Sequence, residues 1–155
     1  MDIQFLLISI VSFLGIYCGM ALSLIAPEEL RMGRKYFLWM FYSVLGIIIA
    51  MLLPFDNLAS ILCSIVVIFT FVKLQISRRV IFNLSSIGLY FGYQIGMFDI
   101  IAGLTLLLGF PIGSLFCTRF ENDDEIDMKV LVLSKKITME FWLFLIPVCV
   151  LFFFI

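Results

Sequence analysis

The stretch Val80–Thr118 reads VIFNLSSIGLYFGYQIGMFDIIAGLTLLLGFPIGSLFCT, is apolar almost throughout and carries Asp99 as its only charge. In a helix, at about 1.5 Å per residue, it is about twice as long as one membrane crossing requires. We therefore expect two membrane helices that fold back on each other at Gly96-Met97-Phe98-Asp99. Glycines punctuate both halves, and the sequence predicts that this Gly-rich central hairpin organises the fold.

The composition places the chain in the membrane class. Hydrophobic residues make up 64% of its 155 residues and charged residues 14%, whereas a soluble domain is about half apolar and about a quarter charged. We expect an all-α, polytopic helical membrane protein. The net charge of −1 argues against a nucleic-acid partner, and the chain has no histidine, the commonest metal ligand. The four cysteines stand singly in apolar runs, so we expect no metal and no cofactor.

The apolar runs predict six transmembrane helices in a single domain that covers residues 1–155. An acidic cytoplasmic loop is expected at 119–129, and apolar residues at helical spacing from Ile126 to Phe141 predict an interfacial amphipathic turn that runs into the last helix. The predicted membrane helices are 3–26, 36–53, 58–73, 80–97, 100–118 and 137–155.

The basic residues gather in alternate connections between these helices. Because positive charge marks the cytoplasmic side, the pattern predicts both termini on the non-cytoplasmic side of the plasma membrane or an equivalent membrane. The basic groups are Arg31, Arg34 and Lys35; Lys73, Arg78 and Arg79; and Arg119, Lys129, Lys135 and Lys136.

Small residues recur at helical spacing, which lets membrane helices approach closely. Gly88, Gly92 and Gly96 predict one flat strip, whose partner we expect to be the first helix or the fifth. Pro111 and Pro147 are each expected to kink a helix, because proline removes a backbone hydrogen bond. The predicted packing residues are Gly15, Gly19, Ser23, Gly88, Gly92, Gly96, Gly109 and Gly113.

A charged segment follows the first predicted helix. Pro27 either stops that helix or starts the next one, and the acids behind it complement a helix N-terminus. The segment is either a solvated connector or a docking motif for a partner or for lipid headgroups. Its charged residues are Glu28, Glu29, Arg31, Arg34 and Lys35.

Asp56 and Asp99 fall in the two outer turns, each preceded by phenylalanine. Brought together, two aspartates can share a proton and activate water. Gly96-Met97-Phe98-Asp99 also resembles the GxGD motif of intramembrane aspartyl peptidases such as prepilin peptidases, which implies a catalytic aspartate at Asp99. Phe98 stands where that motif has its second glycine, and Ile101 stands where those enzymes carry a lysine. The other interpretation is that both aspartates cap helices.

The predicted middle of the membrane is almost wholly apolar, which weighs against ion-coupled transport and against chemistry with charged groups at that depth. We expect a non-enzymatic packing or scaffold subunit of a membrane assembly. The alternatives are a small transporter or lipid-handling protein and, behind it, an enzyme similar to the aspartyl peptidases. The expected partners are membrane lipids and either other membrane proteins or further copies of this chain.

Overall fold

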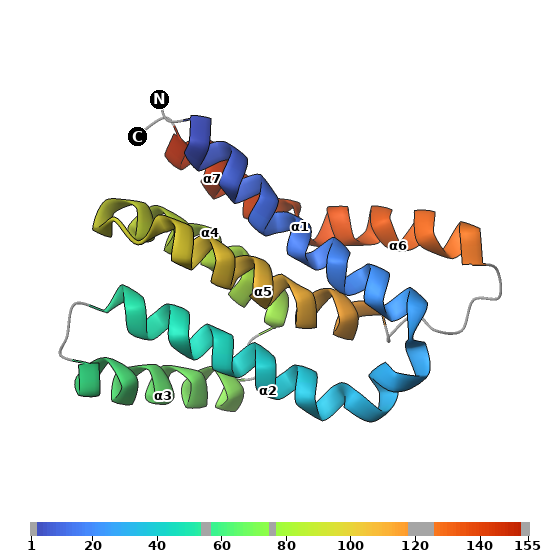
Figure 1. Cartoon of the computed structure of the whole chain (residues 1–155), viewed down its shortest axis with the longest axis horizontal. Helices are drawn as coiled ribbons and strands as arrows, with labels where there is room; N and C mark the ends of the chain where they lie inside the picture. The colour runs from blue at the N-terminus through green and yellow to red at the C-terminus, as the bar shows by residue number, and fades with distance from the viewer. Residues whose placement is uncertain (1–2, 54–56, 75–76, 118–125, 153–155) are drawn as a thin grey trace.

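A computed structural model describes residues 3–53, 57–74, 77–117 and 126–152, and within these ranges the chain is helical and contains no strand (Figure 1). Short connections join consecutive helices into a bundle. The elements are α1 (Ile3–Ile25), α2 (Pro27–Leu52), α3 (Asn57–Lys73), α4 (Arg78–Ile95), α5 (Phe98–Cys117), α6 (Ile126–Phe141), the 3₁₀ turn η2 (Trp142–Phe144) and α7 (Leu145–Phe152).

The centre of the bundle is α5, which packs against α1, α2 and α4. Its contacts with α1 advance together along both helices, from Ser12 beside Ala102 to Gly19 beside Phe110, so α1 and α5 run parallel. In Figure 1 the beginning of α1 and the end of α7 lie at the same end of the bundle, and α3 lies at its periphery beside α2.

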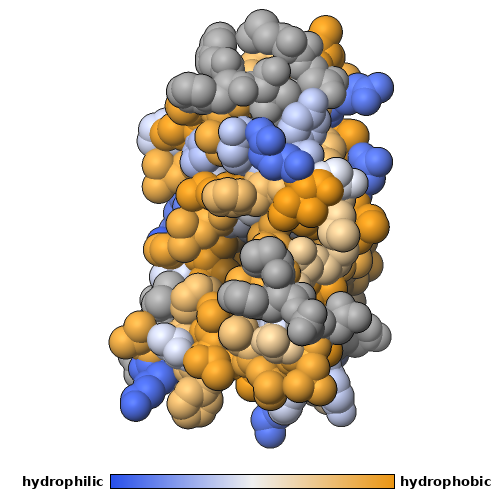
Figure 2. Space-filling view, turned by 90° about the vertical axis from the view of Figure 1, so that its left-hand side faces the viewer, coloured by the Kyte–Doolittle hydropathy of each residue, from blue (hydrophilic) through white to orange (hydrophobic). Residues whose placement is uncertain are grey.

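Three of the described helical segments are long and apolar enough to cross a membrane: Ile3–Ile25, Met32–Leu52 and Phe98–Cys117. Leu58–Lys73 is a shorter apolar helix. Large apolar side chains are exposed along much of the bundle, and Figure 2 shows them over most of one face. Such a surface on the described helices is typical of a protein in a lipid environment.

The second helix is longer than the sequence predicts. It begins at Pro27 rather than at residue 36, so the expected connector is its first turns. Proline fits the first position of a helix, because its missing N–H has no intrahelical partner there. The charged residues that follow are therefore carried on a helix that projects beyond the apolar segment from Met32 to Leu52.

The two internal prolines behave differently. Pro111 lies within α5, which continues through it without interruption. Before Pro147 the helix tightens into the 3₁₀ turn η2. Because Pro147 cannot bond to the Leu143 carbonyl and its ring crowds that group, the preceding turn is where the α-helical pattern fails. The predicted last helix, 137–155, is thus divided between the end of α6, η2 and α7.

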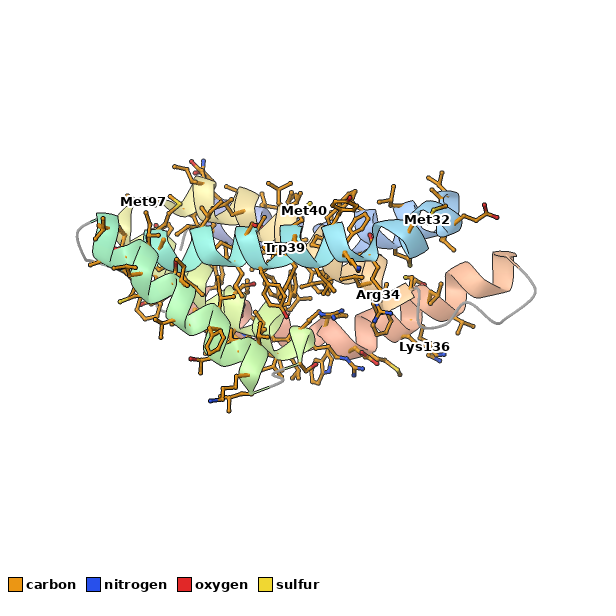
Figure 3. The ribbon with its side chains drawn as sticks, turned by 90° about the horizontal axis from the view of Figure 1, so that it is seen from below. Met32, Arg34, Trp39, Met40, Met97 and Lys136 are labelled. Atoms are coloured by element: carbon orange, nitrogen blue, oxygen red, sulfur yellow. The ribbon has the colours of Figure 1, made fainter. Side chains whose placement is uncertain are left out.

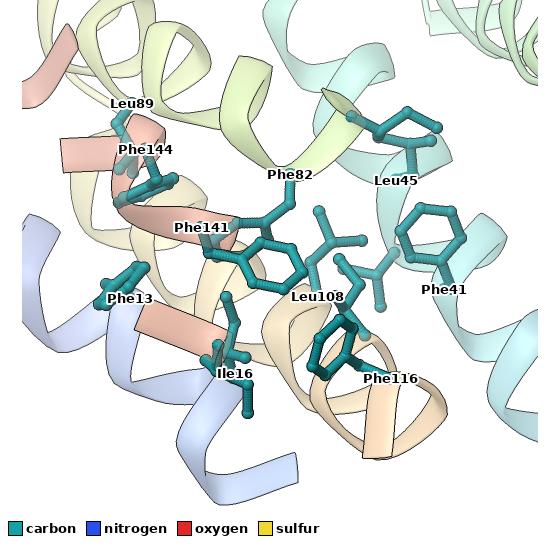
Figure 4. Packing of buried hydrophobic residues seen from close by; sticks show 14 of the residues in the cluster. Phe13, Ile16, Phe41, Leu45, Phe82, Leu89, Leu108, Phe116, Phe141 and Phe144 are labelled. Atoms are coloured by element: carbon teal, nitrogen blue, oxygen red, sulfur yellow. The ribbon is translucent and has the colours of Figure 1, made fainter. Parts of the chain in front are cut away.

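Phenylalanines are the largest of the fully buried side chains in the core (Figure 4). The Phe82 ring of α4 stacks on Phe144 of η2 at 4.9 Å between centroids and meets Phe141 of α6 edge-on at 5.8 Å. Phe13 of α1 stacks on Phe144 at 5.7 Å, and Phe116 of α5 meets Phe141 at 5.9 Å. These five rings hold the C-terminal segment against α1, α4 and α5.

Candidate functional site

The closest approach between elements is the crossing of α1 and α5. A Cβ atom added at Gly15 or Gly19 would collide with the backbone carbonyl oxygen of Leu106 or Phe110. In return, one at Gly109 would lie 2.8 Å from the backbone nitrogen of Ile16. Glycines on both helices therefore let the two backbones touch, as small residues do at tight membrane-helix interfaces.

Serine hydroxyl groups add polar contacts along the same crossing. The Ser12 hydroxyl lies 3.0 Å from the Ala102 carbonyl oxygen, and the Ser114 hydroxyl lies 3.0 Å from that of Gly19. Each also lies within 3.0 Å of a carbonyl oxygen of its own helix, so its proton has two acceptors. Ser23 is the last of these small residues along α1 and is also buried. It lies at the end of α1 that we predict to face the cytoplasm.

The three glycines of α4 do not act as one strip. A Cβ at Gly88 would meet the Leu52 side chain of α2 at 3.3 Å, and one at Gly92 would meet the Ile101 side chain of α5 at 2.6 Å. Gly96 instead ends α4 in the left-handed conformation, with φ of 78°, and its added Cβ would have no neighbour within 4 Å. The glycines of α1 lie against α5. We expected the central hairpin to organise the fold, but the closest packing is at the crossing of α1 and α5.

Asp99 lies in the first turn of α5 and is exposed, whereas Asp56 lies outside the described residues. An acid in a first turn stabilises the helix N-terminus. Whether the two aspartates meet stays a prediction.

We expect Asp99→Asn to leave the fold intact, with a loss of less than about 1 kcal/mol, because asparagine keeps a polar side chain at an exposed helix start. Thermal unfolding in detergent measures this effect. Loss of any assayable activity in an Asp99→Asn protein that unfolds like the parent would instead support the catalytic interpretation.

The charged segment before the second predicted span lies on the first turns of α2. Glu28, Arg34 and Lys35 are exposed there, while the side chains of Glu29 and Arg31 lie outside the described part. Figure 3 shows Arg34 of α2 and Lys136 of α6 in the same end of the bundle. Charged groups from separate helices therefore gather at this end.

The first turn of α4 brings two further arginines to the same end. The Nε atom of Arg79 lies 2.7 Å from a carboxylate oxygen of Glu140 in α6, and its guanidinium carbon lies 5.9 Å from the ring centre of Phe116. Arg79 is thus paired with a charge and stacked over an aromatic face.

Arg78 has a different environment. Burial lowers the pKa of Arg78, the nearby Tyr42 hydroxyl opposes that effect, and the positive charge of Arg34 adds to it. In the described part of the chain, no carboxylate pairs with Arg78. We call Arg34, Arg78 and Arg79 the arginine cluster.

Sequence reasoning placed Arg78 and Arg79 in a connection and did not link them to Glu140. The available signal was the topology itself, which puts both segments at the same membrane surface. Only the fold shows that Glu140 forms an ion pair with Arg79 and not with Arg78.

No family model matches the chain, and no curated protein or solved structure matches it either.

Proposed function

We propose that the chain is a six-span integral membrane protein, non-enzymatic, that acts as a packing subunit of a membrane assembly. The position of α3 carries this proposal. Among the described helices, α3 makes its substantial contacts with α2 alone. There the side chain of Ile68 lies over Gly46, where an added Cβ would be 2.9 Å away, and Ser60 and Ser64 are buried.

The opposite face of α3 is apolar along its whole length. Its residues recur three or four apart, so they form one continuous face. In a membrane such a face meets either lipid tails or another helix. Its exposed side chains are Leu58, Ile61, Leu62, Ile65, Val66, Phe69 and Val72.

The length of α3 favours another helix. Its 17 residues span about 25 Å at about 1.5 Å per residue. A typical hydrocarbon core is about 30 Å thick. A short helix at the periphery deforms the surrounding bilayer, and association with a further helix relieves part of that cost. The partner we propose is a membrane helix of another protein or of a second copy of this chain.

The polar groups within the bundle give transport less support. Thr105 donates to the carbonyl oxygen of Ile101 at 2.8 Å, and Ser85 donates to that of Phe82 at 2.6 Å. These two hydroxyl groups donate their hydrogen bonds to carbonyl oxygens of their own helices. They therefore do not form a row of free polar groups along which an ion or a polar substrate could move. In the three described segments long enough to cross a membrane, the ionised residues Arg34, Lys35 and Asp99 lie close to the beginning of the segment.

A photo-crosslinking amino acid at Ile65 tests the packing role in native membranes. Val11 on α1 is the matched control, since each is the ninth residue of its helix and the side chains of Ile65 and Val11 are 56% and 51% exposed. We expect Ile65 to yield one discrete protein adduct, of the mass of a partner or a dimer, and Val11 to yield lipid adducts. Lipid adducts alone from both positions would contradict the packing role.

The proposed topology has its own test. In a variant whose four native cysteines are replaced by alanine, cysteines introduced singly at Asn57 and Asp123 are expected on opposite sides of the membrane, because basic connections alternate. An impermeant thiol reagent added to intact cells should label the Asn57 position only. Labelling of both positions from outside would refute six spans with both termini outside.

A further inference from the structure

We propose that the exposed face of α3 pairs with the same face of a second copy of this chain, so that two α3 helices lie side by side and parallel. This inference rests on the proposed packing role and names its partner. In Figure 1, α3 lies at the edge of the bundle with α2 as its principal neighbour. A second molecule can therefore reach this face without displacing any other described helix.

A row of side chains runs along the middle of the exposed face. Its members recur alternately four and three residues apart, the spacing that keeps one row of a helix turned toward a parallel partner helix. Each member is a large apolar residue that is between 48% and 74% exposed. We call this row the α3 seam, and it consists of Leu58, Leu62, Ile65, Phe69 and Val72.

A second copy fits the seam because membrane insertion fixes its direction and its depth. Copies of one chain insert with the same topology, so two α3 helices related by a two-fold axis along the membrane normal are parallel and begin at the same level. Each seam residue then meets its own counterpart, Ile65 against Ile65 and Phe69 against Phe69. Lys73 ends the helix and is exposed, so its ammonium group can extend to water and away from its counterpart.

The length of α3 favours its own copy over a helix of another protein. With 17 residues, at about 1.5 Å per residue, α3 spans about 25 Å, and the bilayer must thin where it meets so short a helix. A second α3 requires the same thinning, so pairing removes part of the thinned boundary from both copies. A partner helix of ordinary length would require a thicker bilayer on its own side of the contact.

The exposed apolar area of α3 is close to what a stable protein interface buries. Ile61 and Val66 flank the seam, and the seven side chains together leave roughly 700 Å² exposed, at roughly 150–200 Å² for each side chain if fully exposed. A standard interface buries about 800 Å² per partner. The outward side chains of α4 are only 38–53% exposed, and α4 already packs against α2, α5 and α7. Among these two helices, α3 is therefore the one with an uncovered face of interface size.

Two coexpressed forms of the full-length chain, each with a different epitope tag, test the proposal in native membranes. A photo-crosslinking amino acid at Ile65 of one form should yield an adduct that carries both tags. If every protein adduct lacks the second tag, the second copy is overturned while the packing role stands. Lipid adducts alone would overturn both.

The position of the crosslinker around the helix separates the seam from random collision. Leu62 and Phe69 should yield the two-tag adduct as Ile65 does. Cys63 and Thr70 are exposed on the same turns, but each follows a seam residue by one position and so points about 100° away from it. We expect at most about a fifth of the Ile65 yield from these two positions. Equal yields from all five positions would overturn the seam.

Phe69→Ala removes the largest side chain of the seam and should lower the two-tag yield from Ile65 about fivefold, as truncation of a central interface residue does. Phe91→Ala is the matched control, because it removes the same ring from an exposed position on α4 and should change the yield less than about twofold. Equal losses in both variants would overturn the pairing. If Phe69→Ala does not reach the membrane, Leu62→Ala carries the same prediction.

Discussion

Replacing Gly113 by alanine is expected to lower the free energy of unfolding in detergent by about 3 kcal/mol, the upper end of the usual cost of overpacking. The added methyl group would collide with the backbone carbonyl oxygen of Ile16 and lie 3.1 Å from the backbone nitrogen of Met20. A side chain can rotate away from such a contact, but a helix backbone cannot. The two helices must therefore separate along the whole crossing.

Gly103→Ala is the control for this prediction, since it makes the same change in the same helix. A Cβ at Gly103 would have no neighbour within 4 Å, so the substitution should be neutral, or stabilising by up to about 1 kcal/mol because alanine favours the helix. Unfolding titrations of both variants give the comparison. A Gly113→Ala protein as stable as Gly103→Ala would show that α1 and α5 do not touch.

The second large effect is expected for Phe82→Ala, at about 3–5 kcal/mol. Phe82 is fully buried and its ring contacts both Phe141 and Phe144, so truncation leaves a cavity where α4 meets the C-terminal segment. In lipid this cost comes from lost packing contacts, because the tails that surround the separated helices are as apolar as the core.

Phe91→Ala, in the same helix, provides the comparison for Phe82→Ala. Phe91 is 53% exposed, so its loss exchanges mainly lipid contacts and should cost less than about 1 kcal/mol. Unfolding of the two variants at matched expression measures the difference. Equal costs would mean that the aromatic cluster does not hold the C-terminal segment in place.

The sequence predicted the helical class and several element boundaries because apolar runs and their interruptions are local properties. The helical spacing from Ile126 to Phe141 predicted an amphipathic turn that runs into the last helix; these residues form the separate helix α6, so residues 126–129, expected in the acidic loop, are helical. The predicted start of α2 was wrong, because we assigned the charged residues to a connector. Pro27 and the acids that follow it are equally typical of a helix N-terminus, and α2 begins at Pro27. Composition cannot distinguish a charged loop from a helix that extends beyond the membrane.

The partners of the glycines required the fold. Spacing of four residues identifies a face of a helix and does not say which helix covers it. Gly88 and Gly92, although one turn apart, lie against α2 and α5 respectively, because α4 contacts both of those helices. The arginine cluster was equally hidden, since Arg34 and Arg78 are 44 positions apart in the sequence.

The contact between α1 and α5 also has a consequence for synthesis, because α1 leaves the ribosome well before α5. Gly15 meets Leu106, so α1 enters the membrane before its principal neighbour has been synthesised. At about 5–20 residues per second, the interval lasts from several seconds to about 20 s. During it, the backbone strip of α1 lacks the helix that covers it in the complete fold. A nascent chain arrested before α5 should therefore be the form most readily removed by membrane proteases, and its stability should rise sharply once α5 has emerged.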